Sequence, residues 1–129
     1  MKTSLVTGGA GFIGSTLVRA LLERGDTVRV LDDFSTGKRE NLSPVESEIA
    51  LYEGDIRDNE LLAQAFQGVD LIFHQAAFVS VPLSIKDPET CLDVNVQGTL
   101  KVLMAARKAE VERVVLASSA AVYGDTPDI

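Results

Sequence analysis

Residues 2–14, KTSLVTGGAGFIG, contain the change of period that settles the fold class. Residues 2–7 read as a short strand, whereas residues 12–24 place Ile13, Leu17 and Leu21 on one face of a helix. A glycine cluster at residues 8–14 fills the bend between the two elements. The stretch therefore predicts a buried strand, a tight glycine bend and a helix that packs back on the sheet.

The same alternation of periods runs through the rest of the sequence. Strand-like runs occupy residues 27–31, 49–52, 69–73 and 113–118, and helical patterns occupy residues 59–66 and 88–108, with Asp87 as cap and Pro88 in the first turn. Residues 32–44 read as a loop with at most one helical turn. The order predicts one α/β domain over residues 1–129, a doubly wound parallel sheet with strand order 3-2-1-4-5.

Composition excludes several classes of function. The chain has 129 residues, 46 % of them hydrophobic, and a net charge of −7 from 12 basic and 19 acidic side chains. Such acidity argues against nucleic acid as the main partner. One Cys and one His do not make a zinc site, so no metal is expected. No apolar run has the length of a membrane span, and no export signal is recognised, so a cytoplasmic location is expected.

The glycine bend and a later acid together predict a dinucleotide site. Glycines let the backbone approach a pyrophosphate, and the following helix presents its N–H groups to the anion. Asp32 follows Gly14 by 18 residues, where a carboxylate accepts hydrogen bonds from the adenosine ribose and repels a 2′-phosphate, favouring NAD over NADP. A Walker A loop is excluded because Lys38 is followed by Arg39. In isolation, the glycines could be turn chemistry and Asp32 a solvated strand end or helix cap.

Six stretches in order along the chain resemble the extended short-chain dehydrogenase/reductase family, specifically its NAD-dependent nucleotide-sugar epimerases and dehydratases of Rossmann type. They are residues 7–14 (TGGAGFIG), 32–37 (DDFSTG), 54–58 (GDIRD), 74–77 (HQAA), 95–99 (NVQGT) and 118–124 (SSAAVYG). The loop at residues 80–84, followed by Asp87 and Pro88, resembles the UDP-hexose 4-epimerase branch. A nucleotide-sugar dehydratase or reductase, a stand-alone NAD-binding module without catalysis, and a purely structural domain remain alternatives.

The resemblance implies a role for each matching position. Pyrophosphate contacts are Gly8, Gly11, Phe12, Ile13 and Gly14; ribose contacts are Asp32, Asp33, Phe34, Ser35, Thr36 and Gly37; adenine contacts are Asp55 and Ile56; residues toward the nicotinamide ribose are Gln75, Ala76, Ala77 and Val79; Asn95 supports the site from the long helix; and Ser119 is the catalytic hydroxyl. For three positions, a purely structural role remains an alternative. Asp55 could cap the helix at residues 59–66, His74 could be a packed polar residue, and Ser118 could replace Ser119 or either could bond backbone.

The family's chemistry also uses a Tyr with a Lys four residues later, which lowers the Tyr pKa. Here Tyr52 is followed at that distance by Ile56, and Tyr123 by Pro127. The resemblance therefore implies a truncated chain, the N-terminal part of an epimerase-type enzyme whose substrate is a nucleotide sugar. We expect it to bind NAD without turnover. We also expect a homodimer or larger assembly, because Leu100, Leu103 and Met104 would be partly uncovered.

Overall fold

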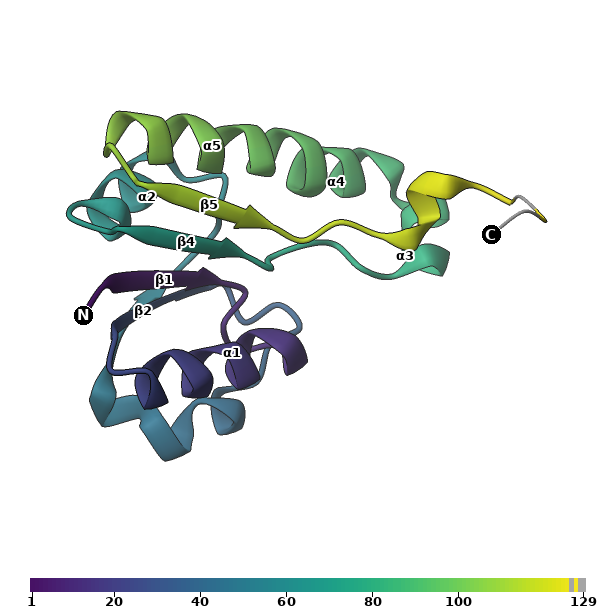
Figure 1. Ribbon diagram of the computed structural model, residues 1–129. Coiled ribbons are helices and arrows are strands. Elements are labelled where there is room, and N and C mark those ends of the chain that lie inside the picture. Colours follow the sequence, from purple (N-terminus) through teal and green to yellow (C-terminus); the bar gives the residue numbers. More distant parts are fainter. Residues whose placement is uncertain (126, 128–129) are drawn as a thin grey trace.

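The computed structural model describes residues 1–125 and 127, and its strands form one parallel five-stranded sheet (Figure 1). The strands are β1 (Thr3–Thr7), β2 (Thr27–Asp32), β3 (Ile49–Glu53), β4 (Leu71–His74) and β5 (Arg113–Leu116). Their order across the sheet is β3-β2-β1-β4-β5, and every neighbouring pair is parallel. The predicted fold class and strand order are confirmed. The chain reverses direction across the sheet at β1, between β2 and β4, which is where such sheets bind ligands.

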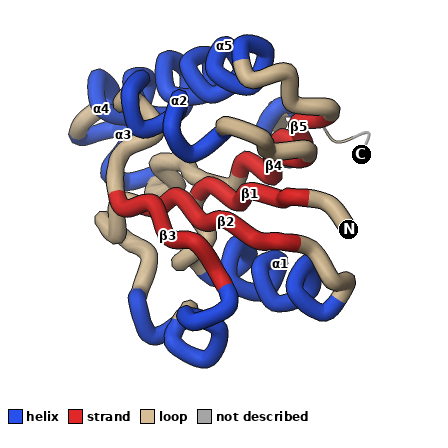
Figure 2. Tube along the Cα trace, turned by 90° about the vertical axis from the view of Figure 1, so that its left-hand side faces the viewer, coloured by secondary structure: helices blue, strands red, loops and turns tan. Residues whose placement is uncertain are grey.

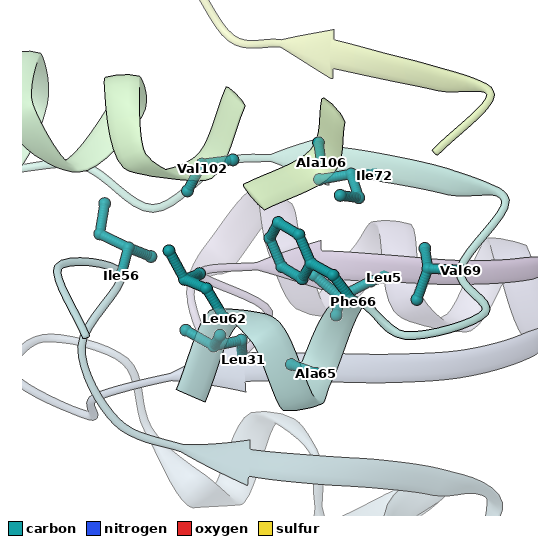
Figure 3. Close-up of a cluster of buried hydrophobic side chains, with 10 residues drawn as sticks. All are labelled: Leu5, Leu31, Ile56, Leu62, Ala65, Phe66, Val69, Ile72, Val102 and Ala106. Carbon is teal, nitrogen blue, oxygen red and sulfur yellow. The ribbon is translucent and has the colours of Figure 1, made fainter. Parts of the chain in front are cut away.

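Helices cover both faces of the sheet (Figure 2). Helix α1 (Phe12–Glu23) lies on one face, and α2 (Asn59–Phe66) and α5 (Thr99–Lys108) lie on the other. Because successive strand residues point to opposite faces, Leu5 belongs to the core under α2 and α5, whereas Val6 belongs to the core under α1. Figure 3 shows the first of these cores, where Phe66 fills the space between sheet and helices. The sheet is therefore buried on both sides, as a doubly wound sheet requires.

The long helix predicted over residues 88–108 is present but not regular. It comprises α4 (Pro88–Leu92), a π-helical segment (Asp93–Gly98) and α5 (Thr99–Lys108), and Asp87 caps its start by accepting a hydrogen bond from Thr90 N at 3.1 Å. Gly98 closes the π-helical segment against Ile56, whose Cδ1 would lie 2.6 Å from a Cβ placed there. The wide turn and the missing side chain let this helix approach the loop after β3. Wide turns of this kind occur often at functional sites.

Some boundaries differ from the sequence expectations. Two 3-10 helices, Arg39–Asn41 and Ser43–Glu48, follow β2, whereas residues 32–44 were expected to be a loop with at most one helical turn. Leu42 anchors them in the core under α1. Residues 81–86 form a short helix, α3 (Val81–Lys86), where a loop was expected. Strand β4 begins at Leu71, two residues late, because Val69 N bonds back to Phe66 O in a turn. Among the described residues, no helix is long and apolar enough to cross a membrane.

Candidate functional site

At Gly8 and Gly14, the glycine bend is held by contacts that admit no side chain. Gly8 adopts φ +70°, and a Cβ there would lie 2.7 Å from Ala76 N. A Cβ on Gly14 would lie 2.0 Å from Gly8 O, so the start of α1 rests directly on the bend. Gly11 N donates to Gly8 O at 3.1 Å and completes the turn. The strand therefore passes into the helix with backbone packed against backbone, as sequence spacing predicted.

The N-terminus of α1 is open toward solvent. Gly11 is the residue before the first helical turn, and no described side chain caps that turn. Phe12 and Ile13 are exposed, at 88 % and 65 % of their surface. The first turn of a helix has N–H groups without intrahelical partners, and the helix dipole adds positive potential there. This end of α1 is suited to an anion such as a pyrophosphate.

Asp32 ends β2 directly beside the glycine bend. Its Oδ2 accepts a hydrogen bond from Ala10 N at 2.8 Å, and its Oδ1 accepts one from Phe34 N at 2.9 Å. Gly37 lies over the carboxylate, because a Cβ there would be 2.9 Å from Asp32 Oδ1. The side chain is 6 % exposed. A carboxylate has about four acceptor positions, so two remain for a ligand at this point.

The segment after Asp32 divides between the site and the core. Asp33 accepts hydrogen bonds from Ser35 N at 2.9 Å and Ser35 Oγ at 2.6 Å, which fixes the turn. Phe34 was expected at the ribose, but its side chain packs against the core under α1, with the Arg39 guanidinium 4.2 Å from the ring centroid. Its aromatic ring is thus a structural anchor for the loop. Only its backbone N–H, on Asp32, reaches the expected site.

Asp55 and Arg57 form a tight pair after β3. Arg57 Nη2 lies 2.6 Å from Asp55 Oδ2, and Arg57 Nε lies 2.9 Å from Oδ1, which also accepts from Arg57 N at 2.8 Å. These bonds lower the pKa of Asp55 and raise the pKa of Arg57. The alternative that Asp55 caps α2 is wrong, since Asp58 accepts from Glu60 N and Leu61 N instead. Asp55 is free to face the cleft.

His74 lies in a buried hydrogen-bond chain at the end of β4. Thr7 Oγ1 accepts from Gln75 N and Ala76 N, both at 3.2 Å, so both its lone pairs are used. Its proton must then point to His74 Nδ1 at 2.7 Å, which leaves Nε2–H to donate to Thr99 Oγ1 at 3.0 Å. Burial lowers the pKa of His74 to about 4. His74 is a neutral packing residue, as the structural alternative predicted.

Asn95 supports the loop after β4 from the π-helical segment. Its Oδ1 accepts from Phe78 N at 2.7 Å, and its Nδ2 donates to Phe78 O at 3.0 Å. The amide thereby replaces the backbone partners that a strand would have given this residue. Asn95 does not line the cleft itself. Its supporting position agrees with the role that the resemblance implied.

These elements surround a cleft of about 590 Å³ at the carboxyl edge of the sheet. It brings together sixteen of the residues expected to bind cofactor: Gly8, Gly11, Phe12, Ile13, Gly14, Asp32, Asp33, Ser35, Thr36, Gly37, Asp55, Ile56, Gln75, Ala76, Ala77 and Val79. Phe34 and Asn95 lie behind its walls. Lining residues that the sequence analysis did not assign are Leu31, Gly54, Arg57, Phe78, Ser80, Leu83, Thr90 and Val94.

One of the missed wall elements, α3, carried a readable signal. Ser80 accepts from Leu83 N at 3.3 Å and begins α3, with Pro82 in its first turn. A capping Ser followed by Pro is a helix-start pattern. Arg57 stood next to two assigned residues, yet its contact with Asp93, 36 residues away, had no local signature.

The structure does not bring Ser119 to the cleft lining. It follows β5, is exposed, and accepts a hydrogen bond from Ala121 N at 3.1 Å at the start of a 3-10 helix (Ala120–Tyr123). This is the backbone contact foreseen as the alternative for this position.

Comparison with known proteins agrees with this architecture. The chain is 42 % identical over 128 residues to a UDP-glucose 4-epimerase of Streptomyces lividans, covering 97 % of this chain and 38 % of that protein. The structure of the Thermus thermophilus UDP-glucose 4-epimerase complex with NAD superposes with a TM-score of 0.90 at 45 % identity, over 98 % of this chain and 40 % of that one. A dTDP-glucose 4,6-dehydratase of Streptomyces venezuelae with NAD bound matches at TM-score 0.82 and 45 % identity, over 87 % and 38 %.

The chain thus spans about two-fifths of the length of these relatives. The model of the NAD dependent epimerase/dehydratase family matches residues 4–129, nearly the whole sequence. With the glycine bend, the acid on β2 and the strand order on the same chain, that match shows that the protein belongs to the NAD dependent epimerase/dehydratase family.

Proposed function

We propose that this chain is the NAD-binding part of a nucleotide-sugar epimerase of the UDP-hexose 4-epimerase type. The observation that carries the proposal is the position of Asp32, whose carboxylate lies 2.8 Å from Ala10 N in the glycine bend and lines the same cleft as the open N-terminus of α1. Anion site and ribose acceptor are adjacent, as an adenine dinucleotide requires.

The residues of the cleft fit that ligand along its length. The N–H groups of Phe12 and Ile13 would hold the pyrophosphate, where the positive end of the helix dipole would offset its charge. The free acceptor positions of Asp32 would accept from the adenosine ribose. Asp55 would lie on the adenine side of the cleft, and the loop after β4, which Asn95 holds in place, on the nicotinamide side.

When bound, NAD would supply the hydride acceptor for transient oxidation at C4 of the sugar and the hydride donor for reduction of the resulting ketone from the opposite face. The role of this chain is to bind and orient the dinucleotide. Ser119 is proposed as the hydroxyl that hydrogen-bonds the sugar oxygen undergoing oxidation, a role that remains open to it because Oγ accepts from Ala121 N and its O–H is still able to donate. Neither Tyr52 nor Tyr123 has a Lys four residues later, so we expect these 129 residues alone to bind NAD and to epimerise nothing.

Calorimetric titration with NAD and NADP tests the proposal. We expect NAD to bind and NADP to bind at least about 10-fold more weakly, because Asp32 and Asp33 place negative charge where the 2′-phosphate would lie. Asp32→Asn should weaken NAD binding and reduce the difference in affinity between NAD and NADP. Absence of NAD binding by a folded chain would contradict the proposal, and epimerisation of UDP-galactose by the chain alone would contradict its catalytic part.

The dehydratase alternative draws support from the Streptomyces venezuelae enzyme, which shares 45 % identity with this chain. The two activities use the same hydride transfer to NAD, so the cleft described above serves either. Joining this chain to the rest of such an enzyme and assaying UDP-glucose against dTDP-glucose would separate them. Formation of UDP-galactose supports the epimerase, and release of water to a 4-keto-6-deoxy sugar supports the dehydratase.

A further inference from the structure

Arg57 joins the loop after β3 to the long helix. Its guanidinium contacts Asp55 through Nε and Nη2, and its Nη1 lies 2.6 Å from Asp93 Oδ2 in the π-helical segment. The Arg57 side chain is 33 % exposed, and the residue lines the cleft. Its planar fork therefore holds two carboxylates from two elements in one fixed geometry.

Two further contacts bring the same loop to the same helix. Lys101 Nζ donates to Arg57 O at 2.7 Å, and Ile56 packs where Gly98 has no side chain. Figure 3 shows Ile56 on the side of the core that faces Val102 of the long helix. The backbone of the loop is thus fixed without Asp93. What Asp93 adds is the orientation of the Arg57 guanidinium and, through it, of the Asp55 carboxylate.

The hydrogen bonds on Asp55 leave it with one directed acceptor position. Oδ1 accepts from both Arg57 N and Arg57 Nε, which uses its two lone pairs, whereas Oδ2 accepts from Arg57 Nη2 alone. The remaining lone pair on Oδ2 is an acceptor in the cleft wall. It suits an N–H donor such as an exocyclic amine and disfavours a carbonyl oxygen.

We propose that Arg57 and Asp93 are positioning residues that aim Asp55 Oδ2 at the exocyclic amine of the adenine and so select adenine over hypoxanthine. The inference rests on the proposed NAD function. It assigns the base preference of the cleft to an ion pair between the loop after β3 and the π-helical segment. Neither Arg57 nor Asp93 needs to touch the ligand, and the nicotinamide side of the cleft does not depend on them.

The test compares NAD with nicotinamide hypoxanthine dinucleotide, which has a carbonyl in place of the amine. The wild-type chain should prefer NAD by about 10-fold, the worth of one hydrogen bond to a charged group. Arg57→Gln should reduce that preference to about 2-fold or less, and Asp93→Asn should reduce it partially. Because the two residues act together, the double variant should be no worse than Arg57→Gln.

Two controls separate orientation from general damage. Binding of nicotinamide mononucleotide should stay within about 2-fold of wild type in all three variants, whereas AMP binding should weaken about 10-fold in Arg57→Gln. Glu112→Gln removes the Lys2–Glu112 pair at the opposite edge of the sheet and should change neither ligand.

The outcomes distinguish the two proposals. If the folded wild-type chain does not bind NAD, the proposed function fails. If NAD binds but the wild-type chain shows no preference over the hypoxanthine analogue, or if Arg57→Gln keeps the full preference, the inference fails and the proposed function stands. Equal loss of AMP and nicotinamide mononucleotide would also overturn it.

Discussion

The half of the molecule around β1, α1 and β2 and the half around β5 and the long helix are stabilised differently. In the first, backbone contacts at the glycine bend and a buried acid build the site, and α1 buries Val18 and Leu21 completely or nearly so. In the second, the long helix buries Val102 and Ala106 but leaves Leu100 and Met104 exposed, at 50 % and 63 %. The first half exposes Phe12 and Ile13 at the cleft, whereas the second presents an apolar helix face outward.

The exposed apolar side chains of the second half share one stripe. They recur every third or fourth residue along the long helix, the spacing of one helical face: Leu92, Val96, Leu100, Leu103 and Met104. Strand β5 adds Val115 and Leu116, at 42 % and 49 % exposed. Because successive strand residues point to opposite faces, at most one of these two side chains lies on the same side as the helix stripe. Exposed apolar stripes of this kind are candidate interaction surfaces. The comparison teaches that the glycine bend and the buried acid lie in one half and the exposed stripe in the other, although Thr90 and Val94 of the long helix also line the cleft.

The largest effect is expected from Gly14→Ala in the first half. Its Cβ would lie 2.0 Å from Gly8 O, which is backbone and cannot rotate away, so helix and bend must separate. We expect the free energy of unfolding to fall by more than about 3 kcal/mol and NAD binding to weaken at least about 100-fold. Urea denaturation and calorimetric titration measure the two.

Gly11→Ala is the matched control for the unfolding measurement. Its Cβ would lie 3.3 Å from Gly8 O and its φ of −78° suits any residue, so it should cost at most about 1 kcal/mol. Equal midpoints for the two alanine variants would contradict the steric account of the bend.

The second prediction concerns the residue that connects the two halves, His74. Burial lowers its folded pKa to about 4, from 6.5 in the unfolded chain. Between these pH values, His74 binds a proton in the unfolded state but not in the folded state. Stability is therefore complete above pH 6.5 and decreases as the pH falls toward 4, by about 3 kcal/mol in total. Asp26 and Asp55, whose pKa values are lowered from 3.8, lose their contribution only at lower pH.

His74→Gln isolates this contribution. A Gln side chain has an oxygen to accept from Thr7 and an amide to donate to Thr99, but it does not titrate. Urea midpoints measured from pH 7 to pH 4 should fall steeply for the wild type and nearly stay level for the variant. A similar slope in both proteins would mean that His74 is not the titrating group.

What the sequence could predict depended on short-range signals. The periods of the strands and helices predicted the strand order, and the spacing of 18 positions from Gly14 to Asp32 predicted the position of Asp32. Both parts of the structure agree. These features follow from hydrophobic alternation and from a backbone bend that only glycine allows, which a reader can recognise along the chain.

What could not be predicted depended on contacts between distant segments. The direction of the Phe34 ring follows from the space available in the core beside α1. The sequence of residues 93–98 has the same hydrophobic pattern as the flanking α-helices, so it does not mark the π-helical segment. The Arg57 contact with Asp93 joins segments 36 residues apart. Such features depend on how elements pack against one another, so local propensity does not predict them. Helix α3 is different, since its capping Ser80 and Pro82 were visible in the sequence.

The smallest effect on folding and the clearest effect on assembly are expected from the apolar stripe. Leu100 and Met104 lie one helical turn apart on its exposed face, so Leu100→Glu with Met104→Glu should change the unfolding free energy by about 1 kcal/mol or less. We expect the wild-type chain to associate at high concentration, burying this stripe against a second copy, and the double variant to remain a 13.8 kDa monomer. Ala63→Glu on the exposed side of α2 adds charge away from the stripe, and this variant should associate like the wild type.

Light scattering across a concentration series measures the mass. A monomeric wild type at every concentration would show that the stripe does not mediate self-association, and would leave the proposed NAD binding untested, because neither Leu100 nor Met104 lines the cleft.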